Sequence, residues 1–306
     1  MIFGIINAFC GVRKDNNQNA FLTLARAGLW ESEVRLLSFE GADLARVHRL
    51  AQEQSVVGLV AVGLEHVRDH KVPKGVALSF VGDTLQMEHR NKVMNEFVAK
   101  LMRLLRDAAI NVLLVKGQGV AQCYERPLWR ASGDIDLLLS ADDYERAKKL
   151  LIPLATMVEQ EFSWMKYIGL ALEGGFLVEL HGTLHTRLSA RVDRLVDSVQ
   201  EDVLRNGNVR VWRNGDTDVF IPAPDDDVIF LFTHILHHFY VEGIGLRQIC
   251  DWCRFLWTYR DKLDIALLER RLLLWRWTSL GCRLRLCLCI VHPGDGHARV
   301  NGFWLL

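Results

Sequence analysis

Hydrophobic and polar positions divide the chain into a helical beginning, a mixed middle and a helical end. Up to residue 108, apolar residues recur every three or four positions, which is the spacing of one face of an α-helix. The longest such stretch, residues 75–109, predicts one long helix. Shorter helices are predicted over residues 20–30, 42–54 and 56–70.

The period changes after residue 109. The compact apolar run 112–115 predicts a buried strand, and 134–139 predicts a strand with acidic residues at one end. Two hairpins are expected, with Gly174-Gly175 and Asn214-Gly215 in their connections. The first hairpin pairs strands 162–172 and 176–180, and the second pairs strands 209–212 and 219–221. Helices are predicted over 117–124 and over 141–151, the second with Ser140 as its N-cap.

Helical spacing returns from Pro224 onward, and from Cys282 the chain fits no period. Helices are predicted over 225–240, 246–259 and 265–277. We interpret the uncharged segment 1–12 as a buried strand or anchor, because it lacks the basic start of a signal peptide. The pattern predicts an α+β protein with an N-terminal helical region (1–108), an α/β core (109–222) and a C-terminal helical region (223–306).

Composition narrows the class of partner. The 306 residues carry 37 basic and 37 acidic side chains, so no overall positive field attracts nucleic acid, and we do not expect a nucleic-acid partner. No apolar run is long enough to cross a bilayer, so we expect no membrane partner. Seven cysteines, an odd number, argue against a secreted disulfide scaffold and predict a cytoplasmic protein.

The string GDIDLLL contains the most informative pair of side chains, Asp134 and Asp136. Residues two apart in a strand project from the same face, so both carboxylates would point together. Two such anions repel unless a cation lies between them, and Mg²⁺ commonly binds carboxylates together with substrate phosphates. The pair is suited to a two-metal site for phosphoryl or nucleotidyl transfer, although the tripeptide alone also fits a solvated strand end.

Neighbouring residues favour the phosphate interpretation. Upstream, in the string LLVKGQG, a strand ends at Lys116-Gly117 and a helix begins, so backbone N–H groups and one cation lie near the same edge. Arg130, Ser132 and Gly133 precede the acids in the string RASGDID. Arg130 could bind phosphate through two hydrogen bonds, and this loop could orient a triphosphate.

A third carboxylate, Glu179, lies in the string FLVELHGTLH within a predicted strand. Val178 and Leu180 would face the core, which leaves Glu179 on the opposite face as a general base or a further metal ligand. An exposed edge-strand glutamate explains the spacing equally well. His181 could share the face of Glu179 and contact substrate, or it could form structural hydrogen bonds, as could His185.

The strings LLVKGQGVAQCY, RASGDIDLLL and VELHGTL, in this order, resemble the uncharacterised nucleotidyltransferase family of the polymerase-β-like superfamily. The later string LFTHILHHFYVEGIGLRQICDW is similar to the helical C-terminal part of that family, and the resemblance covers about residues 44–257. It implies a small mixed sheet with flanking helices, two Mg²⁺ ions on Asp134 and Asp136, Glu179 as the third acid, and a nucleoside triphosphate as donor.

The leading prediction is therefore an enzyme that transfers a nucleoside monophosphate from a nucleoside triphosphate to a hydroxyl of an unidentified small molecule or protein. Asp134, Asp136 and Glu179 would hold metal. The alternative is a catalytically impaired nucleotide-binding or scaffold protein that retains the fold. It is favoured by Gln118, which stands after Gly117 where the wider superfamily has serine, whereas the three acids favour the enzyme.

Two other clusters admit a metal interpretation. His234, His237 and His238 share one predicted helix, and we favour a polar face that lines the cleft or packs on the core over a zinc site. A four-thiolate zinc site could form from two cysteine pairs, Cys250 with Cys253 and Cys287 with Cys289. The first pair falls in an apolar helix, so ordinary buried thiols are the favoured interpretation.

Overall fold

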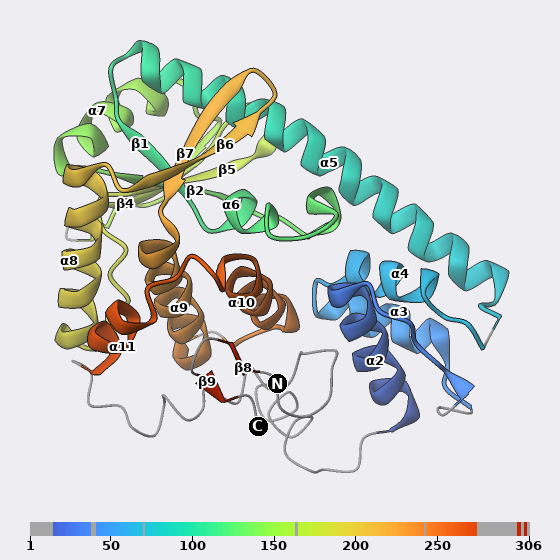
Figure 1. Cartoon of the computed structure of the whole chain (residues 1–306). Helices are drawn as coiled ribbons and strands as arrows, with labels where there is room; N and C mark the ends of the chain where they lie inside the picture. Colours follow the sequence, from blue (N-terminus) through green and yellow to red (C-terminus); the bar gives the residue numbers. More distant parts are fainter. Residues whose placement is uncertain are drawn as a thin grey trace.

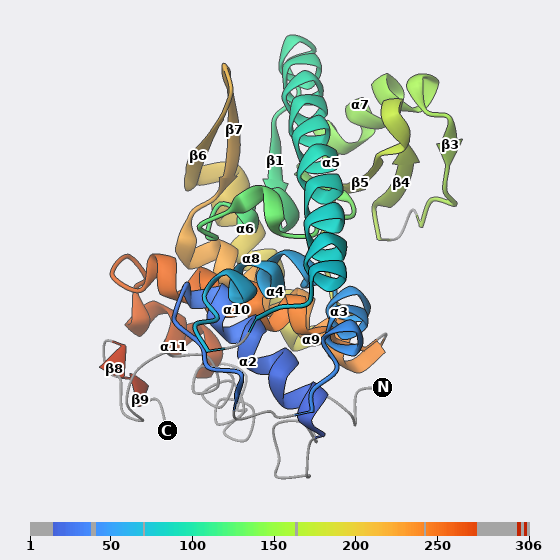
Figure 2. The same cartoon turned by 90° about the vertical axis from the view of Figure 1, so that its right-hand side faces the viewer.

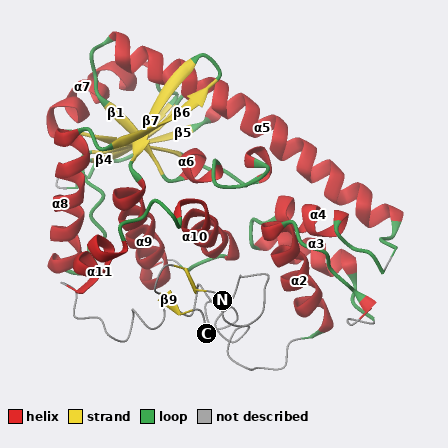
Figure 3. Cartoon of the chain, viewed as in Figure 1, coloured by secondary structure: helices red, strands yellow, loops and turns green. Residues whose placement is uncertain are grey.

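The computed structural model describes residues 15–37, 41–69, 71–162, 165–241, 243–273, 299–300 and 303–304. It shows an α+β protein in which helices surround a small mixed sheet, as predicted (Figures 1 and 3). The predicted buried strand over residues 1–12 and most of the segment after Cys282 lie outside the described residues.

The four predicted N-terminal helices are confirmed. They are α2 (Asn16–Trp30), α3 (Leu44–Glu53), α4 (Val57–Glu65) and α5 (Lys74–Asp107). Helices α2 and α4 approach closely because glycines lie at their crossing. A Cβ on Gly28 would lie 1.7 Å from the carbonyl oxygen of Leu59, and one on Gly63 would lie 2.0 Å from that of Leu24. No other residue allows backbones to pack at this distance.

Helix α5 is 34 residues long and links the N-terminal helices to the sheet, along the upper edge of the molecule in Figure 1. Its buried positions include Phe80 near the start and Met94 and Leu105 further along. Several of the apolar residues that predict this helix face solvent instead, since Leu78 is 60% and Leu85 is 59% exposed. Helical spacing thus identified the helix, while the buried face also contains polar Thr84 and Asn91.

The five strands of the sheet are β1 (Val112–Val115), β2 (Ile135–Leu139), β3 (Met157–Val158), β4 (Tyr167–Ala171) and β5 (Leu177–His181). Their order is β1-β2-β5-β4-β3, with β2 and β5 parallel and the other neighbours antiparallel. The connections contain α6 (Gly117–Ala121), α7 (Ala141–Leu151), η2 (Pro127–Trp129), η3 (Ile152–Leu154) and η4 (Glu173–Gly175). The predicted cap is confirmed, because the Ser140 hydroxyl accepts a hydrogen bond from the backbone N–H of Asp143.

The second predicted hairpin is also confirmed, as β6 (Val209–Asn214) and β7 (Thr217–Pro222), and Gly215 adopts a φ of 63° in its turn. Figure 2 shows this hairpin and the β3–β4 end of the sheet on opposite sides of α5. After it come the C-terminal helices and a short terminal strand pair: α9 (Pro224–Val241), α10 (Leu246–Tyr259), α11 (Ile265–Leu273), β8 (Arg299–Val300) and β9 (Phe303–Trp304).

Helix α8 (Ala190–Asn206) was not predicted, although its sequence contains the signal. Ser189 caps it, and Val192, Val196, Val199 and Val203 recur at helical spacing on its buried face. Four β-branched valines among charged residues resemble strand composition as much as helix composition. The spacing, rather than the residue type, is therefore the informative feature here.

Alternation along the strands separates the sheet into an apolar face and a face with charged groups. Leu137, Val178 and Leu180 belong to a core with α7 and the last turns of α5. Leu138 belongs to a larger core that includes residues of α8, α9 and α10. Side chains two residues apart in a strand point to the same face of the sheet. Asp136 therefore lies on the same face as Leu138, which is the face toward the C-terminal helices.

Among the described residues, no helix combines the length and apolarity that crossing a membrane requires. The three-region division at residues 108 and 222 stays a prediction. The larger core contains residues of all three regions, from Ala20 in α2 to Leu268 in α11.

Candidate active site

The parallel pairing of β2 with β5 brings two predicted site residues together. Asp136 lies opposite Glu179 in the register, and on its other side it lies opposite Val115, the last residue of β1. Lys116 follows directly after β1, so three residues far apart in the chain meet at one edge of the sheet. The predicted common face of Asp136 and Glu179 follows from this register.

Lys116 makes the tightest contact at this edge. Its Nζ donates a hydrogen bond to Oδ1 of Asp136 at 2.7 Å, and their side chains are 14% and 4% exposed. Burial alone would lower the pKa of Lys116, but the Asp136 carboxylate raises it above its ordinary value. Burial acts against ionisation of Asp136 too, yet Lys116 and a hydrogen bond from His181 hold the pKa of Asp136 well below its usual range.

The backbone at Lys116 is unusual, because its φ of 58° falls in the left-handed region that favours glycine. Gly117 follows with a φ of 22°, and a Cβ there would lie 3.6 Å from the carbonyl oxygen of Asp134. This sharp turn brings the Lys-Gly segment beside the start of β2. Strained backbone of this kind is concentrated at functional sites.

His181 lies between the two acids. Its Nε2 is 3.0 Å from Oδ1 of Asp136 and 3.3 Å from Oε2 of Glu179. Tyr167 on β4 donates its hydroxyl to the other oxygen of Glu179, Oε1, at 3.1 Å. The tyrosine ring also packs against His181 at a tilt of 50°, with ring centroids 5.3 Å apart. The possible ligand atoms of Asp136, Glu179 and His181 all lie within 4.8 Å of one another.

Asp134 lies just before β2 and is close enough to interact with the same group. Burial, followed by the negative charges of Asp136 and Glu179, raises its pKa. Three carboxylates outnumber the single ammonium of Lys116, so the edge has an excess of negative charge while His181 is neutral. Burial opposes protonation of His181, but its hydrogen bonds to Asp136 and Glu179 raise its pKa, and a protonated ring would reduce this excess. A divalent cation would offset the excess of negative charge, so the donor set fits a metal ion.

The structure places Arg130 differently from the other predicted residues. Its Nε and Nη2 donate to the two oxygens of Asp251 on α10, at 2.8 and 2.7 Å, and the pair is almost fully buried. The Tyr124 hydroxyl donates to the same carboxylate at 2.7 Å. The remaining nitrogen, Nη1, lies 3.2 Å from the Ser132 hydroxyl. Arg130 therefore anchors the loop before β2 to α10, and Nη1 alone faces the predicted phosphate loop.

Other contacts hold this loop from outside. Asn91 on α5 donates to the carbonyl oxygens of Leu128 and Arg130, both at 2.8 Å, and Arg247 donates to that of Ala131 at 2.9 Å. Gly133 is exposed, and a Cβ there would meet nothing within 4 Å. Open backbone next to Asp134 is compatible with the predicted nucleotide contact.

Gln118, the residue that departs from the superfamily signature, is buried. Its Nε2 lies 2.5 Å from the Met94 sulfur, and its Oε1 has no hydrogen-bond partner. The side chain thus packs into the interior beneath the turn.

The histidines of α9 border the same edge. His234 lies beside the charged group: burial first, and then Lys116, lower its pKa well below the ordinary value, which keeps the ring neutral. Its Nε2 is 3.1 Å from that of His238, while Nδ1 of His237 contacts the carbonyl oxygen of Thr186 at 2.9 Å. The favoured interpretation of a polar helix face packed on the core agrees with this placement.

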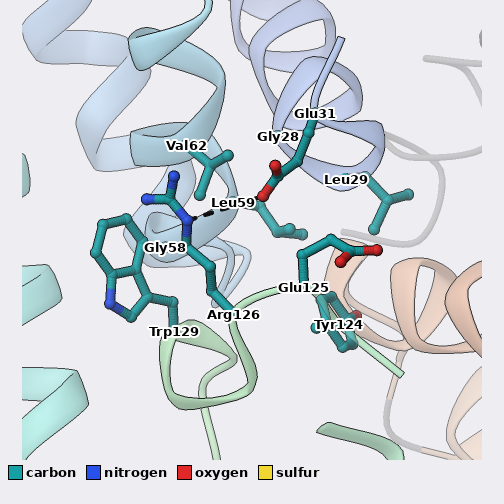
Figure 4. Close-up of a pocket in the computed structure, with 10 residues that line it drawn as sticks. All are labelled: Gly28, Leu29, Glu31, Gly58, Leu59, Val62, Tyr124, Glu125, Arg126 and Trp129. Atoms are coloured by element: carbon teal, nitrogen blue, oxygen red, sulfur yellow. Dashed lines mark ion pairs between the residues drawn. The ribbon is translucent and has the colours of Figure 1, made fainter. Parts of the chain in front are cut away.

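Cys250 and Cys253 are buried and form no disulfide, in agreement with the favoured interpretation, while the other two cysteines of the alternative zinc site lie outside the described residues. A small pocket lies elsewhere, between α2, α4 and the segment around Arg126 (Figure 4). Its lining contains none of the predicted site residues, and Arg126 is paired with Glu65 at 2.6 Å and with Glu31 at 3.8 Å.

Sequence reasoning missed several members of the site. Tyr167 is the first residue of β4, and Glu159 follows directly after β3; the Tyr167 hydroxyl lies 3.5 Å from Oε2 of Glu159. Arg247 and Asp251 come from α10. His181 had been indicated by its spacing of two residues from Glu179, whereas these four residues depend on pairings between distant segments.

A small mixed sheet with acids on two parallel neighbouring strands beside a Lys-Gly turn is the arrangement that the resemblance to nucleotidyltransferases implies. The chain belongs to the uncharacterised nucleotidyltransferase family, whose model matches residues 40–291. Among solved structures, it is similar to an antigenic nucleotidyltransferase-like protein from Paracoccidioides brasiliensis. The identity is 15%, the match covers 65% of this chain and 92% of that chain, and the TM-score is 0.35. No curated protein matches the chain.

Proposed function

We propose that the protein transfers a nucleoside monophosphate from a nucleoside triphosphate to a hydroxyl group of a small-molecule or protein acceptor. The observation that carries the proposal is the register of β2 and β5, which sets Asp136 beside Glu179, with Lys116 bonded to Asp136. Family membership supports the same chemistry. The expected location in a reducing cytoplasm belongs to this proposal and agrees with the three described cysteines, which are buried and form no disulfide.

Asp134, Asp136 and Glu179 are the residues that would hold divalent metal, for which the sequence predicts two Mg²⁺ ions. When bound, the metal would neutralise triphosphate oxygens and polarise the phosphoryl group under attack. The excess of carboxylates over cations at this edge supports that role.

The chain's own residues would bind and orient the donor. Lys116 supplies a buried positive charge that can shift from Asp136 to a phosphate oxygen, as a lysine acts as a point charge. Gly117, Ser132 and Gly133 offer backbone and hydroxyl contacts along the loop. Arg130 contributes Nη1 and, through Asp251, the position of the loop itself.

Glu179 is the residue proposed to take the proton of the acceptor hydroxyl. The hydroxyl oxygen then forms a bond to the α-phosphorus, and the bond from that phosphorus to the bridging oxygen breaks, so that pyrophosphate leaves. Tyr167 fixes one oxygen of Glu179 by its hydrogen bond and leaves the other directed into the site.

Gln118 supports the alternative, a catalytically impaired nucleotide-binding or scaffold protein. Its buried side chain offers no hydroxyl to a phosphate where the wider superfamily has serine. The two candidates differ in turnover but share donor binding, so one experiment can separate them.

The test is transfer of label from α-labelled ATP, GTP, CTP and UTP, with MgCl₂ or MnCl₂, to an acceptor panel and cell extract, with pyrophosphate measured in parallel. Asp136→Asn should abolish both signals, whereas Asp142→Asn, an exposed aspartate of α7, should leave them unchanged. Metal-dependent thermal stabilisation by a nucleotide without turnover would favour the alternative. Neither turnover nor stabilisation with any of the four nucleotides would refute both.

A further inference from the structure

The third side chain at the centre of the acid cluster is an imidazole. His181 is 8% exposed, and its Nε2 is directed at one oxygen of each of two acids. A site designed for Mg²⁺ would place oxygen ligands here, because that ion prefers carboxylates, carbonyls and water. An imidazole between two carboxylates is a ligand set typical of first-row transition ions.

The distances match the edges of a coordination shell. Neighbouring ligands lie about 3.0 Å apart around an octahedral ion with bonds of about 2.1 Å, and about 3.3 Å apart around a tetrahedral ion with bonds of about 2.0 Å. The Nε2 atom of His181 lies 3.0 and 3.3 Å from the two carboxylate oxygens. The three side chains therefore already stand at ligand spacing. For an ion to bind, the Lys116 ammonium, whose Nζ lies 2.7 Å from the same Oδ1 of Asp136, must move aside.

The surrounding hydrogen bonds position the ligands. Tyr167 binds Oε1 of Glu179, which turns Oε2 toward His181, and its ring packs against the imidazole. Such contacts fix the orientation of metal ligands and commonly change metal affinity when they are removed. The register places all three side chains on rigid strands, with Leu138 opposite His181 and Asp136 opposite Glu179.

We propose that Asp136, Glu179 and Nε2 of His181 bind one first-row transition ion, such as Mn²⁺ or Zn²⁺, in preference to Mg²⁺. This inference rests on the proposed function for the purpose of the ion, but not for its binding. Three protein ligands leave further positions for Asp134, water or phosphate oxygens.

Mn²⁺ is the probe for the test, because it has little affinity for thiolates and avoids the seven cysteines of the chain. We expect Mn²⁺ to bind at least about tenfold more tightly than Mg²⁺ in competition. Pulsed electron paramagnetic resonance of bound Mn²⁺ should show coupling to an imidazole nitrogen. Labelling the histidines with ¹⁵N should change that coupling in the unaltered protein.

His181→Gln should weaken Mn²⁺ binding about tenfold or more, change Mg²⁺ binding less than about twofold, and remove the nitrogen coupling. His185→Gln is the matched control, since His185 is only four residues away, is 35% exposed and pairs with Asp197. That variant should behave as the unaltered protein does. Tyr167→Phe should weaken Mn²⁺ binding while retaining the coupling.

The inference would be overturned if the nitrogen coupling persists in His181→Gln. It would also be overturned if the ¹⁵N-labelled protein shows no nitrogen coupling. If His181→Gln does not fold, the absence of a nitrogen coupling from the labelled unaltered protein would still overturn the inference, and loss of Mn²⁺ affinity in Tyr167→Phe would support it. Failure of the proposed function gives a different result, because the coupling would then be present without release of pyrophosphate from any nucleotide.

Discussion

The buried pair of Arg130 and Asp251 should be one of the most sensitive points of the structure. Both side chains are about 5% exposed, and two hydrogen bonds of 2.8 and 2.7 Å join them. Asp251→Ala leaves the guanidinium buried without its anion and deprives the Tyr124 hydroxyl of its acceptor. We expect a loss of about 3 to 5 kcal/mol in the free energy of unfolding, the usual result of removing one partner of such a pair.

The double variant Arg130→Met/Asp251→Leu separates two contributions to the free energy of unfolding: the penalty for leaving one buried charge unpaired, and the net stabilisation that the intact ion pair provides. An apolar pair avoids burying charge, so its loss should be about 1 to 2 kcal/mol, much of it from the unsatisfied Tyr124 hydroxyl. The measurement is urea unfolding followed by circular dichroism, analysed as a double-mutant cycle.

An exposed pair provides the control. Arg205 and Glu201, in successive turns of α8, are 76% and 56% exposed. Glu201→Ala should cost less than about 1 kcal/mol, because solvent screens the interaction. The reasoning fails if Asp251→Ala costs no more than this control, or if the double variant costs as much as the two single changes together.

Three further predictions concern stability and reactivity. The described cysteines are buried, and burial raises the pKa of the Cys123 thiol to about 11, so at least three more thiols should react with a disulfide reagent after unfolding than before it. Burial raises the pKa of Asp227 from 3.8 to about 6. The folded protein therefore binds a proton there that the unfolded chain has lost; stability should fall as pH rises through this window, and Asp227→Asn should remove that part of the slope in urea unfolding. Gly28→Ala should cost about 1 to 3 kcal/mol or more, because its Cβ would overlap α4. Gly82→Ala should stabilise by about 0.5 to 1 kcal/mol, because Gly82 is at an exposed position of α5 where a Cβ meets nothing within 4 Å. Thermal unfolding of both variants would check this.

Local periodicity predicted much of the site because its key residues lie on strands. The strand period of two residues predicted that Asp134 and Asp136 share one face of their strand. It also predicted that Glu179 points to the face opposite Val178 and Leu180, before any strand pairing was known. It could not show that β2 and β5 are neighbours. That pairing joins segments more than forty residues apart, and it turns two local patterns into one cluster.

Arg130 illustrates what sequence alone could not determine. Its position ahead of the acids suggested phosphate binding, but Asp251, 121 residues later, occupies two of its nitrogens. A bidentate guanidinium suits a carboxylate and a phosphate equally well, so the residue type does not identify the partner. The choice depends on how α10 packs against the loop, which is a property of the whole fold.

The site itself contains features that stability alone does not explain. Asp134 stays close to two other carboxylates, and their repulsion raises its pKa. The adjacent Lys116 adopts a backbone conformation that costs about 1 kcal/mol or more for a residue with a Cβ. The carboxylate repulsion and the unfavourable backbone conformation both occur at one edge of an otherwise regular sheet. The strands on both sides of β2 contain fully buried apolar residues, such as Leu114 on β1 and Leu180 on β5. Natural proteins retain such local costs where function requires them, and a divalent cation with an anionic substrate would relieve the repulsion that the folded chain leaves in place.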